Sequence, residues 1–212
     1  MFRRFLLCLL LFAPLLRADE SPDDLAYGLG ARLGERLRME VPGLPLEELI
    51  AGLRQAYRDE PLRLDAQRID LLLAEHEARQ QNADTQRAQA IERRFLVNEK
   101  ARPGVRELDG GVLRTELRAG QGAKPGPRGK VQVRYAGWLA DGSLFDESRT
   151  PQWFNLDSVI DGWRIALLEM PKGAKWRLVI PSAQAYGAEG AGDLIPPYAP
   201  LVFELELLDV AD

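Results

Sequence analysis

The sequence is poor in the residues that most catalytic and metal sites need. Its 212 residues include one histidine and one cysteine, His76 and Cys8. Zinc sites take three or four ligands, mostly His and Cys, so we expect no metal site of that kind. A Ser-His-Asp or Cys-His centre is also excluded, because His76 lies in a polar helical stretch far from the strand-rich half of the chain. No glycine-rich phosphate loop or EF-hand spacing is present, and we expect no cofactor.

Positive charge is not in excess over negative charge. The chain has 28 Lys and Arg against 32 Asp and Glu, a net charge of −4. Nucleic-acid binding requires a basic surface, which this balance does not supply. We therefore expect no nucleic-acid partner.

The first 18 residues have the features of a secretory signal. Arg3 and Arg4 precede an apolar run over residues 5–16, and Ala18 offers a small residue at the cleavage position. A membrane-spanning helix needs about 20 apolar residues, so this run is too short to be one. Cys8 lacks the small residues that precede the cysteine of a lipoprotein signal, which leaves a lipid anchor as a secondary alternative. Cleavage after Ala18 would leave a chain without cysteine, which is compatible with export to the periplasm.

Residues 19–103 have helical composition, rich in Ala, Leu, Arg, Glu and Gln. Apolar residues at helical spacing predict one helix over 25–39 and a second over 46–57. A third helix is predicted to begin after Asp65, a favourable N-cap residue, and to continue without a breaker to Arg102.

The middle of this third helix, residues 75–90, has only alanines as apolar residues. A helix that is polar on all sides usually bridges solvent, so we expect an exposed rod between a helical cluster and a C-terminal domain. A coiled coil would need apolar heptads, which are absent. Two short helices form a thin core, and we therefore predict a homodimer that pairs through residues 23–73.

After Gly104 the pattern changes to the period of two that is typical of β-strands. Apolar and polar residues alternate in three segments, 131–139, 175–180 and 201–207, and residues 112–117 supply an early strand. One short helical pattern runs over 160–170. Antiparallel strands with one polar face and a helix on the apolar face predict an α+β domain over 104–212.

Two features of this domain suggest chemistry. Three acidic residues surround a turn: Asp141, Asp146 and Glu147. Two of them could form the carboxylate pair of a glycoside hydrolase, but hairpin turns also favour acidic residues for conformational reasons. The domain is also rich in aromatic residues, and several of them lie beside turns. This pattern predicts an apolar cavity with aromatic walls, suited to an uncharged ligand.

Several segments of this half together resemble a known family. They are VQVRYAGWLADGSLFD (131–146), VIDGW (159–163), AYG (185–187), IPP (195–197) and LVFELELL (201–208). In this order and spacing they are similar to FKBP-type peptidyl-prolyl cis-trans isomerases. Residues 22–103 resemble the helical dimerisation arm of exported bacterial members, the macrophage infectivity potentiator type. The resemblance implies a twisted antiparallel half-barrel wrapped on the short helix, with a proline pocket between helix and sheet.

The resemblance also implies roles for individual residues. Trp163 would form the floor of the pocket, the backbone N–H of Ile160 would donate to a substrate carbonyl, and Asp146 would orient the rim. The implied catalytic set is Tyr135, Phe145, Asp146, Trp163, Tyr186 and Phe203, and the implied substrate-binding set is Val159, Ile160, Leu194 and Ile195.

The implied partners are proline-containing segments of unfolded or exported polypeptides, bound by a periplasmic homodimer without metal or cofactor. Macrolide inhibitors as ligands and association with the outer membrane stay open as alternatives. A second hypothesis is a chaperone or proline-binding module that holds its clients without turnover.

The sequence departs from the family at two places. Gln152 stands where an aromatic residue forms one wall, and Trp153 and Phe154 follow it. A shifted Trp153 would restore that wall or leave it open. The loop over 187–195 also lacks the Pro-Gly that often precedes the Ile-Pro pair.

Overall fold

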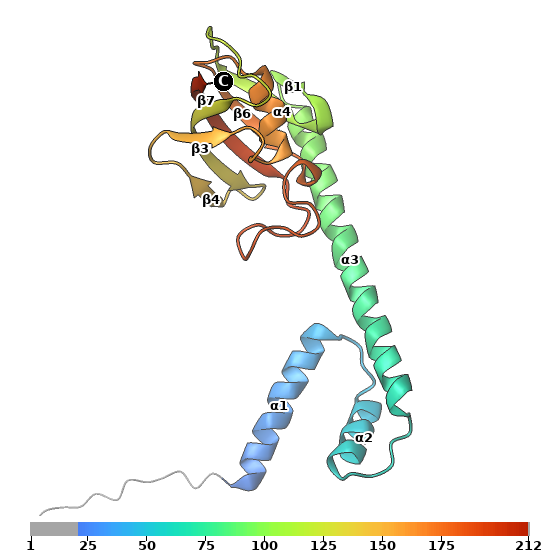
Figure 1. Cartoon of the computed structure of the whole chain (residues 1–212). Coiled ribbons are helices and arrows are strands. Elements are labelled where there is room, and N and C mark those ends of the chain that lie inside the picture. Colours follow the sequence, from blue (N-terminus) through green and yellow to red (C-terminus); the bar gives the residue numbers. More distant parts are fainter. Residues whose placement is uncertain (1–20, 212) are drawn as a thin grey trace, which may run out of the picture. The chain divides into compact units, whose positions relative to one another are not determined.

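The chain divides into two compact units with the boundary after Ile69, and each unit has its own architecture. The computed structural model describes residues 21–211 (Figure 1), so the expected signal segment and Cys8 lie outside the described residues. Within 21–211, no helix combines the length and the apolar character that crossing a membrane requires.

The N-terminal unit contains the first two helices and the start of the third. Their bounds are α1 Pro22–Glu40, α2 Leu46–Tyr57 and α3 Ala66–Lys100. Capping residues fix two of the starts: the Ser21 hydroxyl accepts from the Asp24 N–H at 3.1 Å, and the Asp65 carboxylate accepts from the Arg68 N–H at 2.7 Å. The start of the long helix predicted from Asp65 is therefore confirmed.

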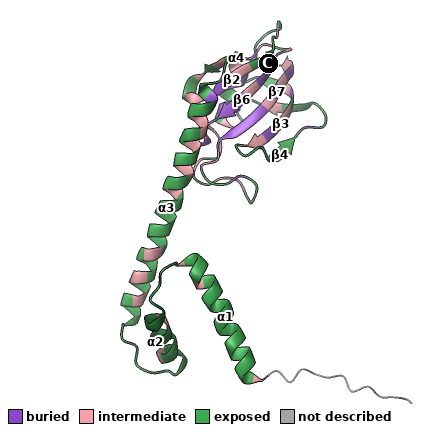
Figure 2. Ribbon diagram, turned by 180° about the vertical axis from the view of Figure 1, so that it is seen from behind, coloured by how far each residue is buried: buried purple, intermediate pink, exposed green. Residues whose placement is uncertain are grey.

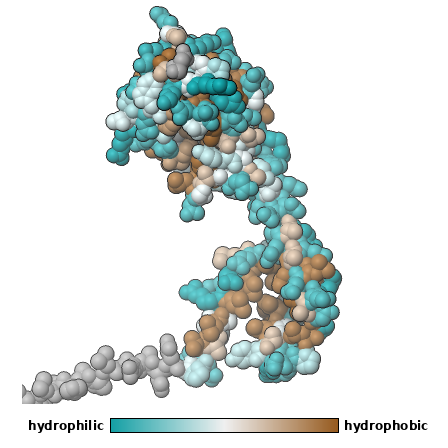
Figure 3. All heavy atoms as spheres, in the orientation of Figure 1, coloured by the Kyte–Doolittle hydropathy of each residue, from teal (hydrophilic) through white to brown (hydrophobic). Residues whose placement is uncertain are grey.

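Helices α1 and α2 contain no buried residue, although both carry apolar stripes. Leu29 is 65% exposed and Tyr57 89% exposed. Apolar side chains gather visibly on this part of the chain (Figure 3). A single copy of the chain therefore leaves the apolar surface of this unit largely in water.

The C-terminal unit, residues 70–212, is built on a seven-stranded sheet in which every pairing is antiparallel. The strands are β1 Val105–Glu107, β2 Leu113–Arg118, β3 Lys130–Leu139, β4 Leu144–Glu147, β5 Gln152–Asn155, β6 Lys175–Ile180 and β7 Leu201–Ala211. Their order is β1-β2-β6-β7-β3-β4, and β5 also pairs with β3. Helix α4 (Asp161–Glu169) and the 3-10 turns η1 (Asp109–Gly111) and η2 (Ser182–Gln184) complete the unit. The predicted α+β architecture is confirmed.

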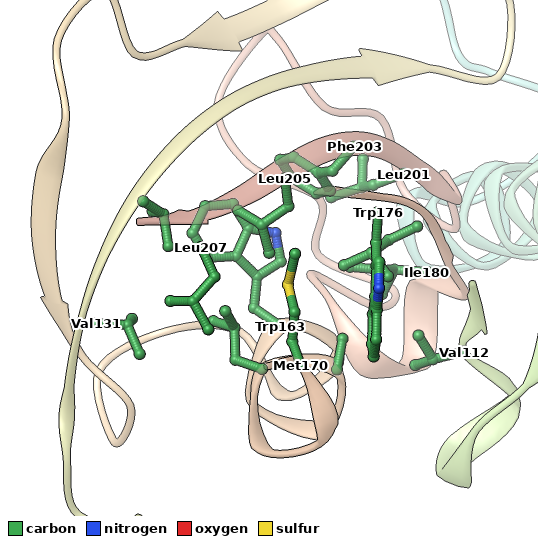
Figure 4. Packing of buried hydrophobic residues seen from close by; sticks show 14 of the residues in the cluster. Val112, Val131, Trp163, Met170, Trp176, Ile180, Leu201, Phe203, Leu205 and Leu207 are labelled. Carbon is green, nitrogen blue, oxygen red and sulfur yellow. The ribbon is translucent and has the colours of Figure 1, made fainter. Parts of the chain in front are cut away.

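The main core lies between α4 and one face of the sheet (Figure 4). Strand β7 shows the alternation that the sequence predicted: Leu201, Phe203, Leu205 and Leu207 all point into this core. Gly162 lets α4 approach the sheet closely, because a Cβ atom there would lie 2.3 Å from Cγ2 of Ile180. The sheet and the helix thus enclose a single apolar layer, which holds the pocket described below.

The opposite face of the sheet carries a second, smaller apolar cluster, formed by Leu113, Val179 and Val202. Phe95 and Leu96 from the end of α3 pack against it. Glu99, the one buried residue of α3, accepts from Arg177 on β6 at 2.6 Å. The expectation that this face is polar was therefore wrong near β2, β6 and β7. The rod is mostly exposed over 75–90 (Figure 2), but its last turns are packed on the sheet.

Candidate active site

A cavity of about 310 Å³ opens between the start of α4 and the inner face of the sheet. Most of its wall is aromatic or aliphatic, and a few polar side chains complete it. The lining residues are Tyr135, Phe145, Asp146, Phe154, Ser158, Val159, Ile160, Trp163, Tyr186 and Phe203. An apolar cavity with few polar groups suits an uncharged ligand of modest size.

Trp163 lies at the centre of the aromatic wall. It comes from the first turn of α4, and its side chain is 5% exposed. Three rings meet it nearly edge-on: Tyr135 at 5.0 Å, Phe203 at 5.2 Å and Phe154 at 5.7 Å between centroids. Edge-to-face pairs are the favoured arrangement of aromatic rings. The rings therefore hold one another in place around Trp163.

Gly137 makes room for two of these rings. It lies on β3 directly opposite Phe203 on β7. A Cβ atom at this position would lie 2.6 Å from the ring of Phe203 and 2.8 Å from the ring of Phe145. The absence of a side chain at Gly137 therefore allows Phe145 and Phe203 to pack edge-on, with centroids 5.5 Å apart.

Tyr135 and Asp146 form the polar pair of the cavity. The Tyr135 hydroxyl donates to Oδ2 of Asp146 at 2.7 Å, and the backbone N–H of Tyr135 donates to the Ser148 hydroxyl at 2.8 Å. Burial, followed by this hydrogen bond and the nearby negative charge of Asp146, raises the pKa of Tyr135 to about 12. Tyr135 is therefore a neutral hydrogen-bond donor at physiological pH, with no tendency to act as a base.

Ile160 offers a backbone donor at the start of α4. It is the N-cap residue, and its carbonyl accepts from the N–H groups of Trp163 and Arg164 at 3.0 and 3.1 Å. Within residues 21–211, its own N–H has no hydrogen-bond partner. Because Ile160 lines the cavity, this group is placed to donate to a bound carbonyl.

Eight of the ten site residues expected from the sequence line the same cavity; Leu194 and Ile195 do not. Ile195 pairs with Ala191 through two backbone hydrogen bonds of 2.8 and 3.1 Å, and its side chain belongs to the core at 5% exposure. Leu194 is 65% exposed. The tight turn between 191 and 195 therefore directs one side chain inward and the other to solvent.

The sequence prediction missed two lining residues, Phe154 and Ser158. Phe154 supplies the aromatic wall that Gln152 lacks, while Trp153 is 47% exposed. Neighbouring residues of a strand point to opposite faces, so only one of the two aromatic residues on β5 can reach the cavity. The register of β5, with Phe154 opposite Val131, selects Phe154.

Neither a cluster of metal ligands nor a histidine is found in the cavity of the described chain. The part of the chain that the structure describes contains no group of three or more His, Cys, Asp and Glu side chains able to hold a metal ion. His76 lies on α3, outside the cavity. The cavity offers an apolar enclosure, a free backbone N–H and the hydroxyl groups of Tyr135, Ser158 and Tyr186, which can bind and orient a ligand without forming a covalent bond to it.

Comparisons with known proteins agree on the similarity of both halves. A family model described as FKBP-type peptidyl-prolyl cis-trans isomerase matches residues 121–208, and one described as the domain amino terminal to such isomerases matches 22–113. The chain is 59% identical over 206 residues to a probable FKBP-type 25 kDa peptidyl-prolyl cis-trans isomerase of Pseudomonas aeruginosa, covering 97% of this chain and 90% of the relative.

Two more distant proteins match along most of their length. The outer membrane protein MIP of Legionella longbeachae is 30% identical over 198 residues, which cover 89% of this chain and 85% of that protein. The crystal structure of FkpA from Escherichia coli matches with a TM-score of 0.64 and 34% identity, covering 91% of this chain and 98% of that structure.

Proposed function

Since the chain belongs to the family of FKBP-type peptidyl-prolyl cis-trans isomerases, we propose that it isomerises prolyl bonds of exported polypeptides in the cavity over Trp163. The observation that carries the proposal is the ring of edge-on aromatic side chains around Trp163, open beside the free N–H of Ile160. A pyrrolidine ring is apolar and compact, and the amide carbonyl before it needs a donor.

The chemistry of the reaction fits a site without a nucleophile or a metal. Rotation of a prolyl amide breaks its partial double bond over a barrier of about 18–20 kcal/mol. The planar amide is more polar than the twisted one, in which the nitrogen lone pair has left conjugation. An aromatic cavity that excludes water therefore disfavours the planar ground state relative to the transition state. A reduction of the barrier by about 5–6 kcal/mol accelerates the rotation roughly ten-thousandfold.

The polar groups then have distinct roles. The Ile160 N–H donates to a substrate carbonyl, and Val159 contacts the chain beside it. Asp146 accepts from Tyr135 at 2.7 Å, so that the Tyr135 ring stays fixed as a wall and the rim keeps its shape. Tyr186 presents a hydroxyl to the cavity that makes no side-chain hydrogen bond within residues 21–211. It is free to bond to the substrate backbone.

The proposal is tested by a protease-free isomerisation assay on peptides with different residues before proline. We expect turnover by the wild type and a fall in kcat/KM of about tenfold for Asp146→Asn, which weakens the charge-assisted bond to Tyr135. Asp141→Asn is the matched control, because Asp141 lies in the hairpin turn before β4, outside the cavity, and loses the same charge. A wild-type rate equal to the uncatalysed rate, with suppression of client aggregation intact, would instead support the chaperone hypothesis.

We also propose that the protein is a homodimer that pairs through residues 23–73. Its support is the exposed apolar surface of α1, α2 and the start of α3, where Leu25, Leu29, Leu53 and Leu73 are all more than half exposed in a single chain. Isolated chains seldom leave so large a patch of apolar side chains in water. A second copy, related by two-fold symmetry, would cover it with the same surface.

The proposed location is the periplasm. The charged start, the apolar run and Ala18 support export, and a relative in Legionella longbeachae is named an outer membrane protein. Exported clients and a mature chain without cysteine are compatible with this location. Fractionation of cells that produce the full chain, with N-terminal sequencing of the product, tests it: a mature protein beginning near Asp19 is expected.

A further inference from the structure

The loop that brings Tyr186 to the cavity is organised around the backbone of Ser182, the first residue of η2. The Ser182 carbonyl accepts from the N–H groups of Ala185 and Gly187, at 2.9 and 2.8 Å. These two residues flank Tyr186 on either side. Gly187 in turn accepts from the Tyr198 N–H at 2.8 Å, which closes the far end of the loop. The position of Ser182 therefore sets the backbone from which the Tyr186 ring projects.

Ser182 is itself held by the long helix. It is 4% exposed, and its N–H donates to Oε1 of Glu92 on α3 at 2.6 Å. Within residues 21–211 this carboxylate is the one acceptor for that N–H. The loop runs beside the end of α3 in Figures 1 and 2.

Glu92 lies on the face of α3 that is packed on the sheet. Phe95 and Glu99 follow it by three and seven residues, a spacing that places all three side chains on one side of a helix. Phe95 packs in the outer apolar cluster and Glu99 binds Arg177. The helix is therefore fixed at several points, and Glu92 extends this rigid contact to the loop.

We propose that Glu92 is a positioning residue of the isomerase site: its carboxylate holds Ser182 and, through Ser182, the loop that presents Tyr186 to the prolyl substrate. This inference rests on the proposed function of the cavity. It also makes the last turns of α3 part of the working isomerase unit, although they precede the family match that begins at residue 121.

The physical reason is that a buried N–H without a partner is unfavourable. If the acceptor is removed, segment 182–187 must shift until the Ser182 N–H reaches water or another acceptor. Tyr186 has no side-chain hydrogen bond of its own to resist this shift within the described chain, and it is 40% exposed. The ring would then leave its place on the cavity wall.

The test uses the full mature chain and compares three variants with the wild type. Glu92→Ala removes the acceptor, and we expect kcat/KM to fall about fivefold, as for the loss of one ordinary hydrogen bond. Glu92→Gln retains a side-chain carbonyl oxygen and should stay within roughly twofold of the wild type. Glu99→Ala is the matched control: it removes the other carboxylate that joins α3 to the sheet, but it does not touch the loop, so kcat/KM should also stay within roughly twofold.

Two further measurements separate positioning from general destabilisation. In a Tyr186→Ala background, Glu92→Ala should have little additional effect on kcat/KM, because the ring and the hydroxyl that Glu92 positions are already absent. Hydrogen exchange of the peptide 182–190 should accelerate in Glu92→Ala and not in Glu99→Ala. Full activity of Glu92→Ala, or a loss that adds fully to that of Tyr186→Ala, would overturn the inference. If the wild type shows no turnover, the proposed function fails, and the exchange measurement alone decides whether Glu92 holds the loop.

Discussion

The two units of this chain differ in how much of their apolar surface is buried within a single copy. In the C-terminal unit, the alternating strands and α4 bury the apolar residues within one copy of the chain, down to full burial of Leu201, Leu205 and Leu207. In the N-terminal unit, α1 and α2 contain no buried residue, although their apolar stripes are as regular. A regular apolar pattern in the sequence therefore does not guarantee that the apolar side chains are buried within one chain.

The difference follows from the lengths of the elements and their number. A sheet of seven strands offers a broad face that one short helix can cover. Two helices of 19 and 12 residues offer only narrow stripes, and a third helix contributes just its first turn. Such a unit is too small to enclose a core of its own, which is the physical basis of the proposed homodimer.

The largest effect is expected from a charge placed on the exposed apolar surface of the N-terminal unit. Leu29→Glu places a charge in the apolar stripe of α1. Burial of a leucine contributes about 2 kcal/mol, and a two-fold dimer loses it twice, so dissociation should become at least about 1000-fold easier. Sedimentation should then show a monomer in which turnover of a short peptide per chain is unchanged, because the cavity lies wholly in the other unit.

Ala31→Glu is the control for that change. It adds the same charge to α1, but two residues further along, about 200° around the helix from Leu29. The dimer should persist in this variant. A monomeric wild type, or equal dissociation of the two variants, would contradict the assignment of the interface.

A second test replaces one glycine by alanine in each unit. We expect the substitution to lower stability in the C-terminal unit and to raise it in the N-terminal unit. Gly162→Ala adds a Cβ atom 2.3 Å from the buried side chain of Ile180, and such overpacking costs about 1–3 kcal/mol, more than alanine gains over glycine in a helix. Gly28→Ala in α1 meets no atom within 4 Å and should stabilise its helix by about 0.5–1 kcal/mol.

The two effects can be read separately. All four tryptophans lie at or beyond residue 138, so tryptophan fluorescence follows unfolding of the C-terminal unit alone, while circular dichroism at 222 nm also follows the helices. A Gly162→Ala midpoint equal to that of the wild type would mean that α4 can move away from β6 at little cost.

Much of this architecture could be predicted because the signals are local. The period of two in residues 201–207 and the N-cap at Asp65 each depend on a few neighbouring residues, and both were confirmed. The family resemblance placed Trp163, Tyr135 and Asp146, and the structure brings all three to one cavity.

What could not be predicted depends on contacts between distant parts of the sequence. Whether Trp153 or Phe154 reaches the cavity is set by the pairing of β5 with β3, which no pattern within four residues determines. Phe95 and Leu96 are a short apolar interruption in a polar helix, and only the apolar cluster around Val179 gives them a partner. Glu92 resembles any exposed helical glutamate until Ser182 is placed beside it.

The last expected effect concerns a single group in the C-terminal unit, and it appears only at alkaline pH. The pKa of Tyr135 is raised to about 12 by burial and by its bond to Asp146, so the unfolded chain, with an ordinary tyrosine pKa near 10, releases this proton first. The corresponding stability is complete below pH 10 and is lost as the pH rises from about 10 to 12. Tyr135→Phe, which has no proton to release, should lose less stability over this interval than the wild type. Denaturant midpoints from tryptophan fluorescence between pH 9 and 12 measure the difference, and the other titrating groups cancel between the two proteins. Parallel curves for the two proteins would show that Tyr135 ionises as easily in the folded state as in the unfolded one, and that the cavity wall is open to water at this point.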